Sequence, residues 1–148
     1  MDMTTLIQPE RVLPNSTASG KRSLLTELAN CLTAMDPDQV LEVVMAREQL
    51  GSTGIGHGVA IPHGRMPDLS HPVIALARHY EGIDFDAIDG APVHIVIMLL
   101  VPDSDDRIHL ELLARLARQL QQSTFRDAIM SADSPVAISE LFCEEQLQ

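Results

Sequence analysis

The stretch VHIVIMLLV, residues 93–101, constrains the fold of this chain more than any other segment. It is almost entirely apolar and rich in β-branched residues, which is typical of a strand that is covered on both faces. Such a strand needs neighbouring strands beside it and helices above and below it. The expected helices come before, between and after the expected strands without regular alternation, so we expect an α/β sandwich with a mixed β-sheet flanked by helices on both faces.

Apolar spacing and capping residues predict the individual elements. The expected helices cover residues 21–35, 37–50, 106–121, 124–131 and 135–146. Their predicted N-caps are Ser19, Asp36, which is followed by a proline at the first helical position, and Ser134. The expected strands cover residues 59–61, 73–80 and 93–101. Residues 1–20, the glycine-rich stretch 51–58 and residues 84–92, with a turn at Asp89-Gly90, are expected to be irregular.

Length and charge narrow the class of protein. A chain of 148 residues predicts a single domain over residues 1–148. Twenty-one acidic and ten basic residues give a formal net charge of −11, which argues against a nucleic-acid partner. No apolar run reaches the roughly 18 residues that a membrane span requires. The start of the chain lacks a signal-peptide pattern, and Cys31 and Cys143 lie far apart, so we expect free thiols and a cytoplasmic location.

Familiar cofactor and metal motifs are not found. The stretch GIGHG at residues 54–58 precedes a predicted strand, whereas a dinucleotide-binding loop follows a strand and opens a helix. The sequence contains no GxxxxGK[ST], GxSxG, HExxH or CxxC motif. The spacing of its six histidines specifies no metal site. We therefore expect neither a cofactor nor a metal.

Two residues interrupt the apolar stripes of predicted helices. Arg47 follows Val40 and Val44 on one stripe, and His109 begins the leucine stripe of the helix over 106–121. An arginine there either meets an anion or lies with its stem on the core and its head in water. A histidine in a first helical turn either faces an anion, which the helix dipole favours, or is a hydrogen-bonded core residue. The residue types leave these alternatives open.

His63 follows the predicted strand over 59–61, in the tetrapeptide Pro62-His63-Gly64-Arg65. Histidine in such a setting can act as an acid, a base, a ligand or a nucleophile. Gly64 leaves room for a bulky group, and Arg65 is near enough in sequence to help neutralise an anion. The alternative is a loop histidine without a role.

Acidic residues gather in two stretches of the second half of the chain. They are Glu81, Asp84, Asp86 and Asp89 in the first stretch, and Asp103, Asp105 and Asp106 in the second. Each cluster is either a solvated loop or a rim that attracts a basic partner.

The stretch REQLGSTGIGHGVAIPHGR, residues 47–65, closely resembles the signature of phosphotransferase-system IIA domains of the fructose/mannitol type. Similar stretches follow in the family's order, namely FDAIDGAPV at 85–93, LLVP at 99–102 and HLELLARLA at 109–117. The resemblance covers roughly residues 5–145 and is greatest for the nitrogen-regulatory branch, IIA-Ntr. It implies the α/β sandwich with a mixed sheet that the patterns also predict.

The resemblance also implies roles for particular residues. His63 corresponds to the phosphorylated histidine, with the tele nitrogen as the candidate atom, and the donor is a phosphorylated HPr-like carrier. The second histidine and the arginine of the family's site fall on His109 and Arg47. Arg65 occupies a position where the family also accepts lysine and is a further candidate for neutralising phosphate. His57 occupies a variable position of the motif.

The expected function is that of a phosphocarrier, a phosphotransferase-type protein with a phosphohistidine intermediate. Because the chain carries no transporter domain, we expect a regulatory phosphorylation switch that acts on target proteins. One alternative is a sugar-specific IIA component that passes its phosphoryl group to a IIB domain. Another is a protein-binding regulator that no longer transfers phosphate. A histidine-based metal hydrolase has no support in the spacing.

Overall fold

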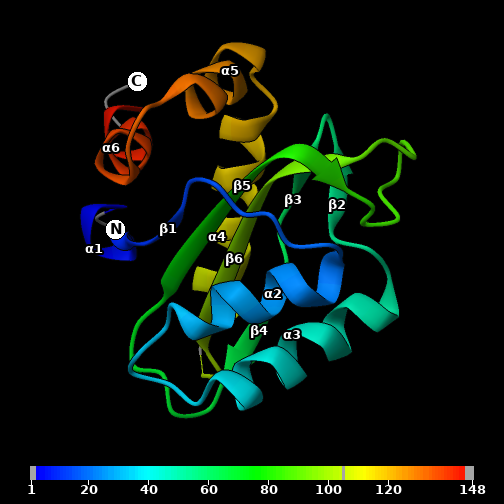
Figure 1. Ribbon diagram of the computed structural model, residues 1–148. Helices are drawn as coiled ribbons and strands as arrows, with labels where there is room; N and C mark the ends of the chain where they lie inside the picture. Colours follow the sequence, from blue (N-terminus) through cyan, green and yellow to red (C-terminus); the bar gives the residue numbers. More distant parts are fainter. Residues whose placement is uncertain (1–2, 105, 146–148) are drawn as a thin grey trace.

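The computed structural model describes residues 3–104 and 106–145 (Figure 1). Its helices are α1 (Met3–Leu6), α2 (Lys21–Asn30), α3 (Pro37–Leu50), α4 (Asp106–Leu120), α5 (Ser123–Ser131) and α6 (Pro135–Glu145). Its strands are β1 (Ile7–Leu13), β2 (Gly54–Gly56), β3 (Val59–Ala60), β4 (His63–Met66), β5 (Val73–Ile83) and β6 (Val93–Pro102).

The strands form one mixed sheet in the order β1-β5-β6-β3-β2, and β4 also pairs with β6. Strand β5 is antiparallel to β6, and β2 is antiparallel to β3. The pairs β1–β5, β3–β6 and β4–β6 are parallel. The predicted mixed sheet is therefore confirmed, with the apolar segment 93–101 as its central strand.

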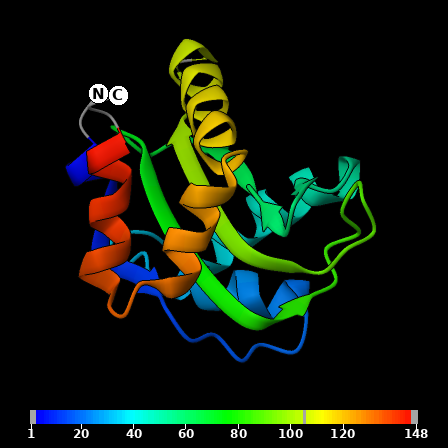
Figure 2. The ribbon, with the colours of Figure 1, turned by 90° about the horizontal axis from the view of Figure 1, so that it is seen from above.

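Alternate residues of β6 face two separate cores. Ile95, Ile97 and Leu99 pack with α4, α5 and α6, whereas Val96 and Met98 pack with α2 and α3. The view from above shows α2 on one side of the sheet and α4 on the other (Figure 2). Burial on both faces explains why this strand lacks the polar alternation of a half-exposed strand.

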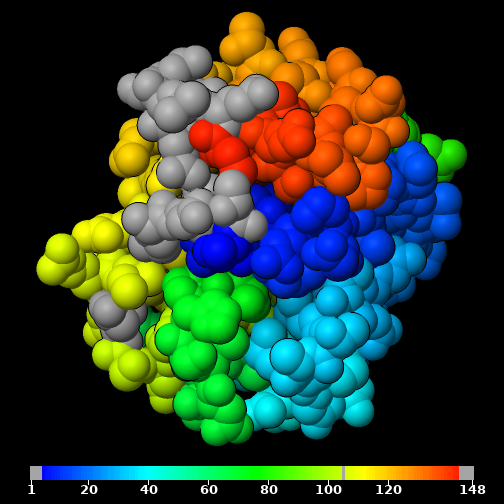
Figure 3. All heavy atoms as spheres, turned by 90° about the vertical axis from the view of Figure 1, so that its left-hand side faces the viewer, coloured from blue at the N-terminus to red at the C-terminus, as the bar shows by residue number. Residues whose placement is uncertain are grey.

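The N-terminal segment departs from the prediction. Residues 1–20 were expected to be irregular, but Met3–Leu6 form α1 and Ile7–Leu13 form β1, which pairs in parallel with β5. Pro9 lies in β1, and an edge strand tolerates proline because its outer side needs no ladder hydrogen bond. Figure 3 shows this segment, in blue, against α6, in red. Strand β1 is rich in polar residues, as an edge strand can be, so a search for apolar patterns does not detect it.

The glycine-rich stretch is also more regular than expected, because Gly54–Gly56 form β2 and pair with β3. A Cβ at Gly54 would lie 2.8 Å from the Cβ of Ala87, so glycine permits the close approach of the 84–92 loop. The turn between β2 and β3 holds His57 at a φ of 58° and Gly58 at 79°. Glycine here allows a tight hairpin rather than an irregular loop.

The helices follow the prediction with small differences at their ends. Helix α3 has the predicted bounds, and the Asp36 side chain accepts a hydrogen bond of 3.0 Å from the N–H of Asp38. Helix α2 ends at Asn30 rather than at residue 35, and its N-cap is Gly20 rather than Ser19. Helix α6 begins as predicted, with Ser134 Oγ accepting from the N–H of Ala137, while residue 146 lies outside the described residues.

Candidate functional site

An open pocket of about 490 Å³ lies where α3, β4 and the start of α4 meet. Arg47 comes from α3, His63 and Arg65 come from β4, and His109 comes from α4. The structure thus brings together four predicted site residues from three elements. Val43, Ala46, Leu50 and Gly64 complete the lining.

His63 is the first residue of β4, which runs parallel to β6 with His63 opposite Leu99. The sequence suggested a histidine beyond a strand, whereas the structure places it in a short strand of its own. Its Nδ1 lies 2.8 Å from the carbonyl oxygen of Ile61. A carbonyl only accepts, so Nδ1 carries the hydrogen and Nε2 carries the lone pair. Within the described part of the chain, Nε2 makes no hydrogen bond, and it is therefore the available nucleophilic atom.

The surroundings of His63 favour its neutral form. Burial lowers the pKa of His63 below its ordinary value, and the charge of Arg47 lowers it further. The Ile61 carbonyl and the carboxylate of Glu48 act in the opposite direction but do not outweigh burial. Because the ordinary pKa of histidine is about 6.5, His63 is neutral at neutral pH, as a nucleophile must be.

His109 lies directly beside His63. Their ring centroids are 5.2 Å apart, and the ring planes are nearly perpendicular, at 87°. His109 is 8% exposed, and its buried Nδ1 has no hydrogen-bond partner among residues 3–104 and 106–145. A hydrogen-bonded core histidine would need such a partner. The geometry therefore favours the alternative in which His109 faces an anion.

Burial also lowers the pKa of His109. The positive charge of Arg65, and that of His63 whenever its ring is protonated, lower the pKa further, whereas the carboxylate of Asp106 raises it. His109 is consequently neutral at neutral pH and holds one ring N–H that it can donate. An anion placed between His109 and His63 would raise the pKa of His109 again.

Arg47 does not lie on the buried stripe of α3, as its spacing from Val40 and Val44 suggested. The buried position after Val44 is Glu48, which follows at the i+4 spacing of a helix. Arg47 is half-buried beside the pocket, and its Nη1 donates a hydrogen bond of 2.8 Å to the carbonyl oxygen of Gly51. Its remaining N–H groups make no other hydrogen bond to a described residue.

Arg65 and His57 lie in different places. Arg65 lines the pocket, and its guanidinium pairs with the carboxylate of Asp106 in the first turn of α4. Both side chains are substantially exposed, so the ion pair is weak and can exchange partners.

His57 is exposed on the β2–β3 turn, where its main-chain N–H donates to the carboxylate of Asp89. It does not line the pocket.

The sequence reasoning missed Glu48, which is only 7% exposed and pairs with Lys21 at 3.0 Å. The available signal was a charged residue four positions after Val44, on the stripe that Val40 and Val44 begin. The spacing analysis assigned the neighbouring Arg47 to that stripe instead. No group of three or more potential metal ligands occurs among the described residues. Within the same ranges, no helix is both long and apolar enough to cross a membrane.

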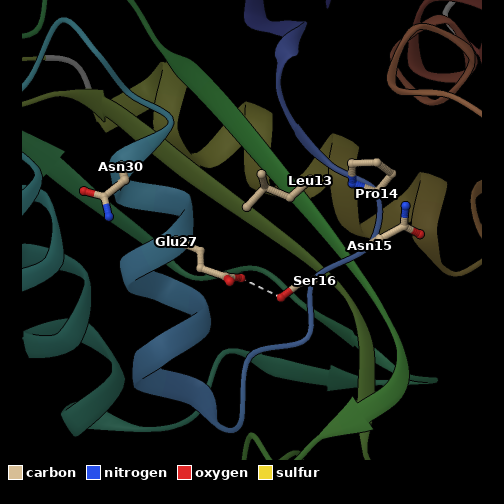
Figure 4. Close-up of a pocket in the computed structure, with 6 residues that line it drawn as sticks. All are labelled: Leu13, Pro14, Asn15, Ser16, Glu27 and Asn30. Atoms are coloured by element: carbon tan, nitrogen blue, oxygen red, sulfur yellow. Dashed lines mark hydrogen bonds between the residues drawn. The ribbon is translucent and has the colours of Figure 1, made fainter.

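Another hollow, of about 450 Å³, lies between α2 and the segment that follows β1 (Figure 4). Its polar lining includes Ser16, whose hydroxyl donates to the carboxylate of Glu27 at 2.6 Å, and the amides of Asn15 and Asn30. It contains neither histidine nor arginine, so it offers no group for phosphoryl chemistry.

The chain is similar to known proteins over nearly its whole length. Residues 5–145 match the family described as phosphoenolpyruvate-dependent sugar phosphotransferase system, EIIA 2. A nitrogen regulatory protein of Pseudomonas aeruginosa is 37% identical over 145 residues, which cover 95% of this chain and 94% of that protein. A fructose-specific EIIA component of Haloferax volcanii is 35% identical, covering 88% of this chain and 86% of the relative.

A solved structure of a nitrogen regulatory protein is also similar to this chain. The crystal structure of the nitrogen regulatory protein IIA-Ntr from Neisseria meningitidis superposes with a TM-score of 0.90 and 33% identity. The match covers 95% of this chain and 98% of that one. Together with the family match over nearly the whole chain, these likenesses show that the chain belongs to the EIIA 2 family of the phosphoenolpyruvate-dependent sugar phosphotransferase system.

Proposed function

We propose that the chain accepts a phosphoryl group on Nε2 of His63 from a phosphorylated HPr-like carrier and acts as a regulatory phosphorylation switch. The observation that carries the proposal is the state of the His63 ring. Its Nδ1 hydrogen is held by the Ile61 carbonyl, and its Nε2 is unbonded within the described residues. The ring lines an open pocket that it shares with His109 and Arg47.

The transfer follows from these positions. The lone pair on Nε2 of His63 attacks the phosphorus of the donor's phosphohistidine in line with the N–P bond that breaks. The electron pair of that bond returns to the donor's imidazole, and a new Nε2–P bond forms. The proton stays on Nδ1 of His63 and keeps its hydrogen bond to the Ile61 carbonyl throughout, so the positive charge that develops on the ring faces a fixed dipole.

Arg47 and His109 stabilise the transferring group. Charge spreads over the equatorial oxygens of the phosphoryl group in the transition state, and preorganised donors in a partly buried site stabilise it. Arg47 keeps N–H groups free beside His63, and the ring of His109 lies 5.2 Å away between centroids. Arg65 can leave Asp106 to contribute a further positive charge at the rim.

The relatives favour the regulatory reading. The nitrogen regulatory protein of P. aeruginosa matches nearly end to end, and the IIA-Ntr structure superposes closely. The fructose-specific relative supports the second candidate, a IIA component that passes its group to a IIB domain. Incubating the phosphorylated chain with IIB domains separates the two, because only a sugar component loses its label to a IIB domain at a catalytically useful rate.

The pocket rim offers apolar surface to a partner. Leu50, at the end of α3, is 85% exposed and lines the pocket, and Leu110, beside His109, is 65% exposed. Large exposed apolar side chains near a site are typical of surfaces that contact another protein. Of the acidic cluster expected to steer a basic donor, Asp103 is exposed, Asp106 pairs with Arg65, and Asp105 lies outside the described residues. The steering role is tested by the salt dependence of donor association in Asp103→Asn.

The test of the function is phosphorylation itself. The chain is incubated with the general phosphotransferase components and labelled phosphoenolpyruvate. We expect an acid-labile, base-stable label on the wild type and on His57→Ala, which alters a histidine outside the pocket, and none on His63→Ala. Such a label on His63→Ala would overturn the assignment.

A further inference from the structure

The last turn of α3 carries two adjacent charged residues that serve different places. Arg47 lines the pocket, whereas Glu48 is 7% exposed. One carboxylate oxygen of Glu48 pairs with Lys21 Nζ at 3.0 Å. The other accepts from the N–H of Thr53 at 3.1 Å and from the Thr53 hydroxyl. Three donors on one buried carboxylate hold its charge and its orientation.

Hydrogen bonds continue from Glu48 to His63. The carbonyl oxygen of Thr53 accepts from the N–H of Ile61 at 3.0 Å, and the carbonyl oxygen of Ile61 accepts from His63 Nδ1 at 2.8 Å. Thr53 is 5% exposed and Ile61 is 3% exposed, so little water competes for these bonds. The Ile61 carbonyl, which sets the hydrogen on Nδ1, is thus held at the end of a buried relay that begins at Glu48.

Stability alone does not account for this arrangement. A buried ion pair adds little net stability compared with apolar packing of the same volume. Helix α3 is already anchored by Val40 and Val44, both completely buried. An apolar residue at position 48 could fill the same volume but could not accept the hydrogen bonds of Thr53.

We infer that Glu48 is a positioning residue for His63: through Thr53 it holds the Ile61 carbonyl and so keeps the His63 ring in the tautomer that leaves Nε2 as the nucleophile. Thr53 is the intermediary, and Lys21 compensates the buried charge. The relay concerns the unphosphorylated protein, and only its effect on transfer rate rests on the proposed function.

The charge of Glu48 provides a signature that simple loosening would not. Its carboxylate raises the pKa of His63, against burial and Arg47. Removing that charge lowers the pKa of His63 further. A variant that merely loosened the site would expose the ring and move the pKa the other way, toward its ordinary value. The two explanations thus predict shifts of opposite sign.

The experiment is nitrogen NMR of the histidine rings in the unphosphorylated protein, recorded across a pH titration. In the wild type we expect His63 with hydrogen on Nδ1. Glu48→Gln should give a mixture of tautomers and a lower pKa for His63. Thr53→Val, which keeps the side-chain shape and removes the hydroxyl, should give the mixture with little change in pKa. Glu42→Gln, an exposed carboxylate on the same helix, should change neither.

The rate of phosphoryl acceptance supplies the second readout. Glu48→Gln should slow transfer about tenfold, as loss of a supporting partner of a reacting group does, without changing the KM for the donor. A folded Glu48→Gln protein with the wild-type tautomer and pKa overturns the inference. If that variant does not fold, an unchanged tautomer in Thr53→Val overturns it. A wild type that accepts no phosphoryl group refutes the proposed function, while the tautomer measurement still decides the role of Glu48.

Discussion

His63 and His109 lie beside each other at one end of β6, and His79 and His94 lie near its other end, where β5 and β6 pair. Burial does not distinguish the two pairs, because His109 is 8% exposed and His79 is 5% exposed. The hydrogen bonds made by their ring nitrogens differ between the two pairs. His79 Nε2 donates to the Ala18 carbonyl at 2.9 Å, and its Nδ1 accepts from the N–H of Gly82 at 3.0 Å.

His94 continues the pattern of the second pair, since its Nδ1 donates to the carbonyl of His79 at 3.0 Å. The main chain thus uses both nitrogens of His79, and the pair joins strands and loops. In the first pair, His63 Nε2 and His109 Nδ1 are unbonded among the described residues, and both rings line a pocket. His94 Nε2 also makes no hydrogen bond to a described residue, so an unbonded nitrogen is not sufficient by itself. The comparison teaches that unbonded ring nitrogens on two rings that share one pocket, rather than burial, mark the histidines that are available for chemistry.

The largest effect should separate His63 from His79. His63→Gln should abolish phosphoryl acceptance and leave the thermal midpoint nearly unchanged, because the ring is only half-buried. His79→Gln should be labelled like the wild type but unfold more easily, by about 1–3 kcal/mol, since it disturbs two buried main-chain partners. Labelling and thermal unfolding of both variants check this. Loss of labelling in a folded His79→Gln protein would break the comparison.

The next effect concerns the second member of each pair. His109→Ala should slow phosphoryl transfer about a hundredfold with little change in the KM for the donor, because its donor group acts on the transferring phosphoryl. His94→Ala should leave the rate unchanged. Rapid-mixing kinetics with phosphorylated donor measure both. A raised KM with a normal maximal rate in His109→Ala would assign that residue to docking instead.

A glycine lies close to each histidine pair, at a position where an added Cβ would clash with a neighbouring side chain. A Cβ at Gly64 would lie 2.4 Å from Val43 Cγ1, and one at Gly82, whose φ is +93°, would lie 2.8 Å from the Cβ of Pro92. Either alanine variant should lose about 1–3 kcal/mol of unfolding free energy. Only Gly64→Ala should also slow transfer, by about tenfold or more, because it pushes β4 and His63 away from α3. Equal rates in the two variants would show that the spacing between β4 and α3 does not matter.

The smallest expected effect is on the pH dependence of stability. Burial lowers the pKa of both His63 and His109 in the folded protein, so the unfolded chain takes up their protons first as the pH falls. Their contribution is fully present above the ordinary histidine pKa of about 6.5 and declines as the pH falls toward the lower folded values. His63→Ala should lose less stability on acidification than the wild type does. Urea unfolding at several pH values between about 7.5 and 5 measures the free energy of unfolding of both proteins. An identical decline in the two proteins would contradict the expected direction of the effect.

The strand over 93–101 and helix α3 were predictable because burial on both faces, and an Asp-Pro start, leave few alternatives. Strand β1 was not, because Pro9, Glu10 and Arg11 give an edge strand the composition of a loop. The gathering of Arg47, His63 and His109 was expected from the family resemblance, since spacing alone left each with an alternative. Residue spacing alone does not separate the two histidine pairs, because their difference in hydrogen bonding lies between distant segments.

The site is assembled from α3, β4 and α4, and β6 lies between the last two in sequence. None of its elements can form the pocket by itself, and each needs contacts that are distant along the chain. Under the proposed function, a chain that has lost its native topology therefore leaves the phosphoryl-exchange pool at once. Damaged or half-folded copies would therefore take no phosphoryl group from the donor.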